Sequence, residues 1–185
     1  AQQVTLQSIN KETEACYQTI EADCTAALKK DPVIVCGGEH GCGLGYIKAL
    51  SKQGQEFGIL QIDAHMDCRT HYAEYTFSHA SAITHYSPYA THITQVGIRD
   101  YAEEEQVFQS NSATTFSVFY DDQLHADLFK GNTWHAICEK IIESLPKNVV
   151  ISLDIDGLCP SYCPDTGTPV PGGLSYNQCC YLLSM

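Results

Sequence analysis

The chain has 185 residues, of which 44% are hydrophobic and 10% aromatic, and this composition is typical of a globular protein rather than a disordered one. Its formal net charge of -12, from 22 acidic and 10 basic residues, argues against nucleic acid or an anionic membrane surface as a partner. The same charge favours a cationic substrate or metal ions as ligands. No apolar stretch approaches the roughly 20 residues that would span a membrane.

Ten cysteines are a high count for a chain of this length. The opening residues, AQQVTLQSINKE, contain no apolar segment of the kind found in secretory signals, so we predict a reducing, cytoplasmic location. We therefore expect most of the cysteines to be small buried residues, as at Cys36 and Cys138, rather than disulfide partners. Cys159 and Cys163 form a C-x3-C pattern, which is only a weak zinc signal because no second pair accompanies it.

Helical patterns and apolar runs alternate along the chain. The predicted helices are residues 10–30, residues 43–54, which Gly54 closes, and residues 133–146, which Pro146 stops. The predicted strands are the apolar runs at residues 31–40, 56–65, 93–101, 114–122 and 148–156. A loop over residues 157–173 leads to a last helix at residues 174–185. Apolar strands separated by helices indicate a mostly parallel sheet covered on both faces, so we predict one three-layer α/β/α sandwich domain over residues 1–185.

Three of the predicted strands end in side chains that bind metal ions. They supply, in chain order, His40, then Asp63, His65 and Asp67, and then Asp154 and Asp156. The carboxyl ends of parallel strands share one edge of a sheet, and alternate residues of an extended chain point the same way, so these groups are expected to converge. Four carboxylates and two imidazoles in one place require cations. An oxygen-rich set with two imidazoles and no thiolate favours Mn2+.

Two other interpretations of these residues are open at this stage. A D-x-H-x-D sequence is often a surface turn or a local cap, and D-x-D alone is a weaker signal still. Cys36 and Cys68 lie near the candidate ligands in sequence and would suit zinc instead. The metal-site hypothesis therefore depends on the position that all three segments share, directly after apolar strands.

Four segments together resemble the ureohydrolase family of arginases, agmatinases and formimidoylglutamases: GGEH (37–40), DAHMD (63–67), SHAS (78–81) and SLDIDGLCPSYCPDTGTPVPGGLSY (152–176). The resemblance covers most of the chain and implies an arginase-like α/β/α fold, a homo-oligomer of three or six subunits and two Mn2+ ions per subunit. One ion would be held by His40, Asp63, Asp67 and Asp154. The other would be held by His65, Asp63, Asp154 and Asp156, so that Asp63 and Asp154 bridge the two ions.

The resemblance also implies a reaction. A metal-bridging hydroxide would attack the carbon of a guanidino or formimino group and cleave a C–N bond, and agmatine would give putrescine and urea. Asp67 and His79 are the expected catalytic residues, and His79 would also contact the substrate and deliver a proton to the leaving amine. The alternative for His79 is a core histidine without a catalytic role.

Differences from arginases bear on the substrate. Arginases carry an Asn shortly after D-A-H-x-D and an acid two positions after the IRD segment, where this chain has Arg69 and Ala102. Both differences disfavour L-arginine. The pattern R-x-x-Y (69–72) followed by FSHAS (77–81) resembles agmatinases, and an acidic chain suits a small cationic guanidino substrate such as agmatine. Arg69 is an expected substrate contact that would suit the carboxylate of formimidoylglutamate. A salt bridge from Arg69 to a neighbouring acid such as Glu74 is the alternative, so arginase and formimidoylglutamase activities are both kept as candidates.

Two departures from the family pattern bear on activity. Glu39 replaces the Asp that usually precedes His40, and we expect it to affect how His40 is held rather than to abolish metal binding. The chain is also shorter than family members, so we expect it to be truncated at both ends and to lack the Glu that contacts the substrate guanidinium. A catalytically silent, metal-binding homologue with a structural or regulatory role is therefore the alternative from another functional class.

Overall fold

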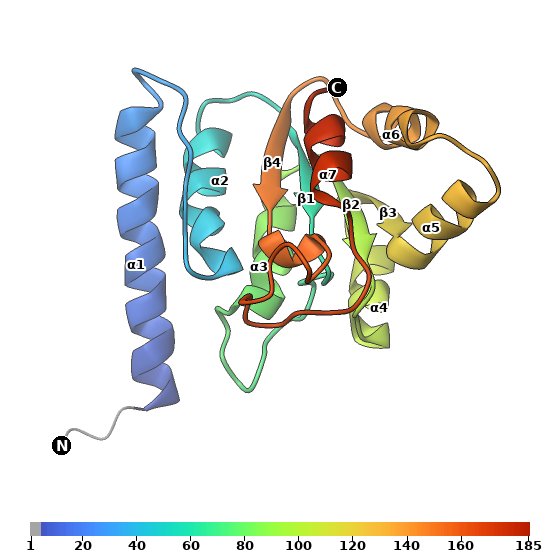
Figure 1. The fold of residues 1–185 in the computed structure, drawn as a ribbon. Helices are drawn as coiled ribbons and strands as arrows, with labels where there is room; N and C mark the ends of the chain where they lie inside the picture. Colours follow the sequence, from blue (N-terminus) through green and yellow to red (C-terminus); the bar gives the residue numbers. More distant parts are fainter. Residues whose placement is uncertain (1–4) are drawn as a thin grey trace.

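The computed structural model describes residues 5–185, and its centre is a four-stranded sheet in which every strand pairing is parallel (Figure 1). The strands are β1 (Gly58–Ile62), β2 (His92–Ile98), β3 (Thr115–Tyr120) and β4 (Val149–Leu153). Their order across the sheet is β3-β2-β1-β4, so β1 lies inside the sheet and is buried along its whole length. The predicted parallel sheet is confirmed.

Helices cover both faces of the sheet, which confirms the predicted three layers (Figure 1). One layer contains α1 (Leu6–Ala27), α2 (Leu44–Ser51), α3 (Ala82–Tyr86) and α4 (Glu103–Asn111). The other layer contains α5 (Asp121–Phe129), α6 (Trp134–Glu143) and α7 (Tyr176–Leu183). Short 3₁₀ turns occupy His40–Gly43, His79–Ser81, Ser87–Tyr89 and Ile155–Gly157.

The alternation of side chains along β1 divides the core into two halves. Ile59 packs into the half that includes Ile47 of α2 and Ile83 of α3. Leu60 and Ile62 pack into the other half, against the apolar faces of α6 and α7. Because both faces of β1 are buried, its sequence is a nearly continuous apolar run. Its one polar residue is Gln61, which is completely buried.

The predicted strand at residues 31–40 is wrong. Residues 32–37 form no helix or strand, and Ile34 is 88% exposed. A β-strand needs a neighbouring strand to satisfy its backbone hydrogen bonds, and this segment pairs with none of the described strands. The apolar run VIV suggested a strand, but an apolar run does not show whether a pairing partner exists.

The short helices α3, α4 and α5 were not predicted, because they are brief and weakly apolar. The expectation for the cysteines is also only partly met. All ten are free thiols, but only four of them are buried: Cys24, Cys68, Cys138 and Cys179. Cys36 is exposed because the segment that carries it does not enter the sheet.

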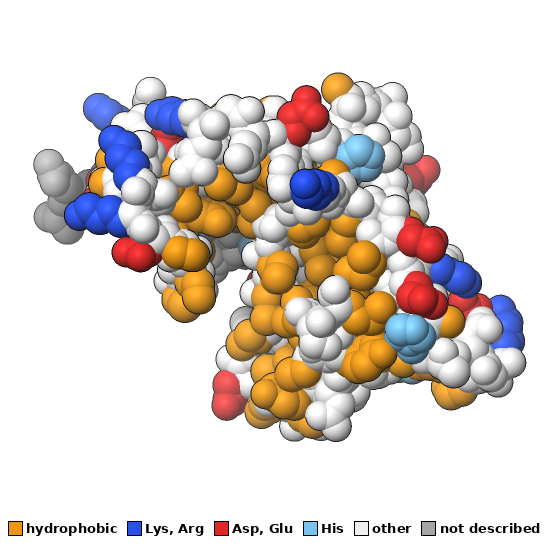
Figure 2. Space-filling view, turned by 90° about the horizontal axis from the view of Figure 1, so that it is seen from above, with side chains coloured by type: hydrophobic (Ala, Val, Ile, Leu, Met, Phe, Trp, Pro, Cys, Tyr) orange, Lys and Arg blue, Asp and Glu red, His pale blue; other side chains and the backbone are white. Residues whose placement is uncertain are grey.

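Strand β4 forms one edge of the sheet and leaves apolar side chains exposed. Ile151 is 54% exposed and Leu153 is 45% exposed. Figure 2 shows hydrophobic side chains open to solvent over a wide area, on both sides of a hollow. Within residues 5–185, no helix combines the length and the apolar character that crossing a bilayer would require.

Candidate metal centre

The register of the sheet brings the candidate ligands together. Ile62 at the end of β1 lies opposite Leu153 of β4, and the Asp154 N–H continues this ladder by donating to the Ile62 carbonyl at 2.9 Å. Asp63 and Asp154 therefore leave neighbouring strands at the same level. The turn after β4 also packs closely against the backbone of Asp63, since a Cβ on Gly157 would lie 2.7 Å from the Asp63 nitrogen. Only glycine permits this approach.

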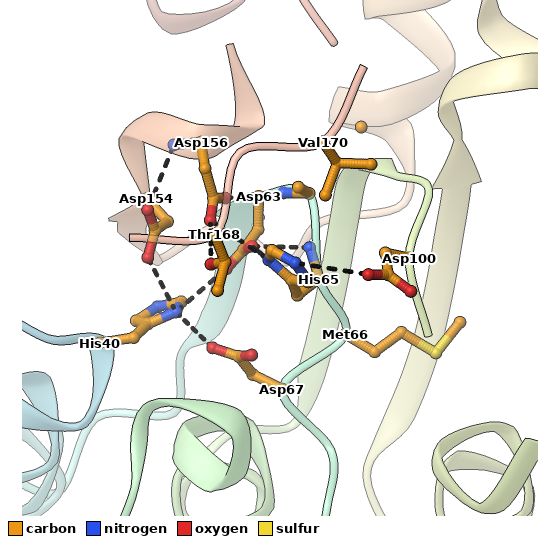
Figure 3. A network of polar contacts seen from close by, with 12 residues as sticks. His40, Asp63, His65, Met66, Asp67, Asp100, Asp154, Asp156, Thr168 and Val170 are labelled. Atoms are coloured by element: carbon orange, nitrogen blue, oxygen red, sulfur yellow. Dashed lines mark hydrogen bonds and ion pairs between the residues drawn. The ribbon is translucent and has the colours of Figure 1, made fainter. Parts of the chain in front are cut away.

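The first group of ligands consists of His40, Asp63 and Asp67 (Figure 3). His40 Nδ1 lies 2.8 Å from Asp67 Oδ2 and 3.0 Å from Asp63 Oδ2. The opposite ring nitrogen, Nε2, lies 2.7 Å from the Ser152 hydroxyl, which fixes the plane of the imidazole. The ring thus presents Nδ1 to two carboxylates that are themselves buried.

The second group consists of Asp63, His65 and Asp156 (Figure 3). His65 Nδ1 lies 3.2 Å from Asp156 Oδ2 and 3.6 Å from Asp63 Oδ1. Asp156 is held in place because the Ala64 N–H donates to its Oδ1 and the Thr168 hydroxyl donates to its Oδ2. Asp63 belongs to both groups, and each of its two oxygens faces a different histidine.

Asp154 lies at the border of the first group. Its Oδ2 is 3.8 Å from His40 Nδ1, while its Oδ1 accepts a hydrogen bond from the Asp156 N–H. Burial and the charges of Asp63 and Asp156 raise its pKa above the ordinary value. The structure thus brings all six predicted ligands to one place, with Asp63 in the shared position and Asp154 beside His40.

The crowding of like charges shifts the pKa values in this cluster. Burial opposes a charged imidazole, but hydrogen bonds to Asp63 and Asp67 outweigh it and raise the pKa of His40 well above its usual value. Against the same opposing effect of burial, Asp156 and Asp63 raise the pKa of His65 to about 10. Burial and the neighbouring charge of Asp63 raise the pKa of Asp67 to about 7. Without a bound metal ion, the crowded carboxylates therefore favour the protonated forms of His40, His65 and Asp67.

These residues fit divalent metal ions. In each group the ligand atoms lie within 4.8 Å of one another, and they are carboxylate oxygens and imidazole nitrogens. Such a set suits hard to borderline ions such as Mn2+. Among the described residues neither group contains a cysteine, and Cys68 is buried with its thiol donating to the Met66 carbonyl. The zinc interpretation based on Cys36 and Cys68 therefore has no support in the geometry.

Local backbone features place the two outer ligands of the first group. Asp67 has a φ of 53°, in the left-handed region that Asp tolerates better than most residues, and its carbonyl accepts a hydrogen bond from the Ile83 N–H of α3 at 3.0 Å. Glu39, beside His40, accepts hydrogen bonds from the Tyr17 hydroxyl at 3.0 Å and from the Gly41 N–H at 2.9 Å. Glu39 thus anchors the turn that carries His40, as a residue that supports a ligand would do.

His79 and Arg69 lie outside the two ligand groups. His79 is exposed at the start of a 3₁₀ turn, with its ring 5.6 Å from that of Tyr72, so it is not a core histidine. Arg69 donates to Glu104 Oε1 at 3.1 Å, and its guanidinium lies 5.7 Å from the Tyr72 ring centroid. The expected alternative, a salt bridge to a neighbouring acid, is present, but its partner is Glu104 of α4 rather than Glu74. The catalytic role of His79 and the substrate contact of Arg69 stay predictions.

Arg99 has a supporting role in the site that was not predicted from the sequence. Its guanidinium donates to backbone carbonyls of Gly97, Asp156, Leu158 and Val170, at 2.6 to 3.3 Å. Arg99 therefore joins the end of β2 to the turn that carries Asp156. One feature of the sequence could have suggested this role: an arginine directly follows the apolar strand ITQVGI. A partly buried guanidinium at that position needs several hydrogen-bond acceptors.

Fold and site together define a parallel α/β/α sandwich with two adjoining candidate metal clusters at the carboxyl ends of its strands. Residues 1–185 match the family model described as Arginase family. The chain belongs to the arginase family.

Individual relatives agree with this assignment. The chain is 32% identical over 151 residues to an N(1)-aminopropylagmatine ureohydrolase of Thermus thermophilus, covering 82% of this chain and 48% of the relative. It is 29% identical to an agmatinase of Pyrococcus horikoshii, covering 77% of this chain and 45% of that protein. The structure of the agmatine ureohydrolase of Thermoplasma volcanium matches with a TM-score of 0.76 at 28% identity, covering 92% of this chain and 55% of that one. The chain thus spans about half the length of these relatives.

Proposed function

We propose that this chain carries the metal centre of a dimanganese ureohydrolase, which hydrolyses a guanidino compound to urea and an amine. The observation that carries the proposal is the position of Asp63. Its Oδ2 lies 3.0 Å from His40, its Oδ1 lies 3.6 Å from His65, and it belongs to both ligand groups. A buried carboxylate in this position is suited to bridge two cations, and the oxygen-rich ligand set favours Mn2+.

The chemistry required of the site is difficult without metal ions, because a guanidinium carbon is a poor electrophile and neutral water is a poor nucleophile. When bound, two divalent ions activate water and stabilise the negative charge that develops on the substrate. The protein residues hold the ions in place and exclude other arrangements of the carboxylates. In the overall step a water oxygen bonds to the guanidino carbon, the C–N bond breaks, and a proton passes to the departing nitrogen.

His79 is the proposed donor of that proton. It is exposed at the start of the 3₁₀ turn His79–Ser81. Histidine is the side chain that most often acts as a general acid in enzymes, and it can both give and regain a proton during turnover. Asp67 is proposed to act through the metal that it shares with His40.

The proposed substrate is agmatine, which would yield putrescine. The names of the relatives from Thermus thermophilus and Pyrococcus horikoshii support a substrate of the agmatine type. Charge supports it too, because the exposed carboxylate of Asp100 lies 3.9 Å from His65 Nε2 and the chain as a whole is strongly acidic. The engagement of Arg69 by Glu104 counts against a substrate carboxylate, as in formimidoylglutamate, at that position.

Metal analysis combined with a urea-release assay tests the proposal. The protein should be purified from its native source, loaded with Mn2+, and assayed for urea from agmatine and from arginine, and for formamide from formimidoylglutamate. We expect two Mn2+ per chain and urea from agmatine. Two ions with no product from any substrate would support a silent metal-binding homologue, and fewer than two ions would contradict the proposed centre.

A further inference from the structure

Three glutamine side chains form a hydrogen-bonded chain that leads from α4 to Asp63, the candidate ligand shared by both groups. Gln61 and Gln95 are both 0% exposed, and they are register partners on the neighbouring strands β1 and β2. Gln109 lies on α4, which packs on the same face of the sheet. The core on this side of the sheet is largely apolar, so the buried amides of Gln61 and Gln95 need hydrogen-bond partners.

The hydrogen bonds of this glutamine chain all run in one direction. Gln109 Nε2 donates to Gln95 Oε1 at 2.5 Å, and Gln95 Nε2 donates to Gln61 Oε1 at 2.5 Å. Gln61 Nε2 then donates to Asp63 Oδ2 at 2.8 Å. The amides of Gln61 and Gln95 thus point their NH2 groups toward the candidate metal centre and their oxygens toward α4.

Backbone carbonyls fix this direction. Gln95 Nε2 also donates to the Met66 carbonyl at 2.8 Å, and Gln61 Nε2 donates to the His65 carbonyl at 3.2 Å. A flipped amide would place its oxygen against a carbonyl oxygen and leave buried polar groups without hydrogen-bond partners, which is unfavourable. The donor of Gln61 therefore faces Asp63 whether or not a metal ion is present.

The result is that both oxygens of Asp63 are held by the protein. Oδ1 accepts a hydrogen bond from the His65 N–H at 2.7 Å, and Oδ2 accepts one from Gln61. A carboxylate that serves two clusters must not rotate, because rotation would turn one oxygen away from one of the histidines. Apolar side chains at positions 61 and 95 would fill the sheet without the cost of burying amides.

We propose that Gln61, held by Gln95 and Gln109, is a positioning residue that fixes the carboxylate of Asp63 for both metal clusters. The inference rests on the proposed function, since it assigns Gln61 a role in that metal centre. It also extends the centre to α4, a helix that carries none of the predicted ligands.

Mn2+ titration of variants tests the positioning role. Gln61→Met keeps the volume of the side chain but removes the donor, and the Mn2+ dissociation constant should rise by about 10–100-fold, as is usual when a residue that orients a ligand is removed. Gln95→Met should have a smaller effect in the same direction. Thr94→Val is the matched control, because buried Thr94 bonds only Ser144 on the opposite face of the sheet. A folded Gln61→Met protein with unchanged Mn2+ affinity would overturn the inference.

A second measurement does not depend on metal. In the metal-free protein, the side-chain amide protons of Gln61 should exchange slowly with solvent, and its nitrogen should show NMR coupling through the hydrogen bond to the Asp63 carboxylate. Fast exchange or the absence of this coupling would also overturn the inference. If wild-type protein binds no Mn2+, the proposed function fails, and the NMR measurement still decides whether the glutamine chain holds Asp63.

Discussion

Substituting the three carboxylates one at a time should separate the two metal ions. Asp67 belongs only to the His40 group and Asp156 only to the His65 group, whereas Asp63 belongs to both. Asp67→Asn should therefore remove one ion, Asp156→Asn should remove the other, and Asp63→Asn should remove both. Each change keeps the shape of the side chain and removes its charge. Asp165→Asn, an exposed position in the loop after β4, is the control.

The size of the effect follows from the number of ions lost. At a free Mn2+ concentration of about 100 times the dissociation constant, each bound ion raises the free energy of unfolding by about 2.7 kcal/mol. In a chain of this length, 1 kcal/mol changes Tm by about 2–4 °C. Loss of one ion should thus reduce the Mn2+-induced rise in Tm by about 5–10 °C. Asp63→Asn should reduce it by about 10–20 °C, which removes the whole effect.

Thermal unfolding with and without Mn2+ measures these differences for each variant. Because each variant is compared with itself, the direct destabilisation caused by the substitution cancels. Elemental analysis of the dialysed proteins gives the number of ions independently. An Asp63→Asn protein that still binds one ion, or an Asp67→Asn protein that loses both, would refute the division of ligands derived from the geometry.

Four further predictions concern pH, a bridge, a proton donor and a structural link. In the metal-free protein, the stability contributed by the raised pKa values of Asp67 and His65 is full at low pH and is lost as pH rises through about 7 and about 10, respectively. Mn2+ binds deprotonated ligands, so the Mn2+ affinity should rise with pH over this range and binding should release protons. Calorimetry in buffers of different ionisation enthalpy measures the proton release. An affinity that does not change with pH would contradict this prediction. Asp154→Ala should lower Mn2+ occupancy below two per chain, and full occupancy in elemental analysis would exclude it as a bridge. His79→Ala should keep both ions but lower kcat by about 10²–10⁴-fold, whereas His71→Ala in the same loop should not; equal rates in the two variants would exclude His79 as the proton donor. Arg99→Met should lower the free energy of unfolding by about 3 kcal/mol in urea titration, because four carbonyls lose a charged donor, and a loss under about 0.5 kcal/mol would mean that water replaces it.

Hydrophobic patterns predicted the strands correctly where a segment pairs with a neighbouring strand of the sheet. The apolar runs before Asp63 and Asp154 became β1 and β4, and their register placed the ligands that follow at one level. The same kind of run at residues 31–40 failed, because a strand is defined by its neighbour as well as by its own residues. The ligand His40 nevertheless reached the site, held by the Ser152 hydroxyl and by the turn that Glu39 anchors.

The supporting residues could not be predicted because they act through tertiary contacts. Gln61 and Gln95 are single polar residues inside two apolar strands, and nothing in one strand reveals that they are register partners. Arg99 serves carbonyls as far away in sequence as Val170. The sequence suggested Glu74 as the salt-bridge partner of Arg69, but the fold brings Glu104 of α4 to its guanidinium. Residue types pointed to the candidate ligands, and the topology of the fold determined which groups support them.

Anomalous diffraction from crystals loaded with Mn2+ tests the central claim most directly. Two manganese peaks should appear, one bounded by His40, Asp63 and Asp67, and the other by Asp63, His65 and Asp156. A single peak, or two peaks that do not share the Asp63 carboxylate, would contradict the dinuclear centre.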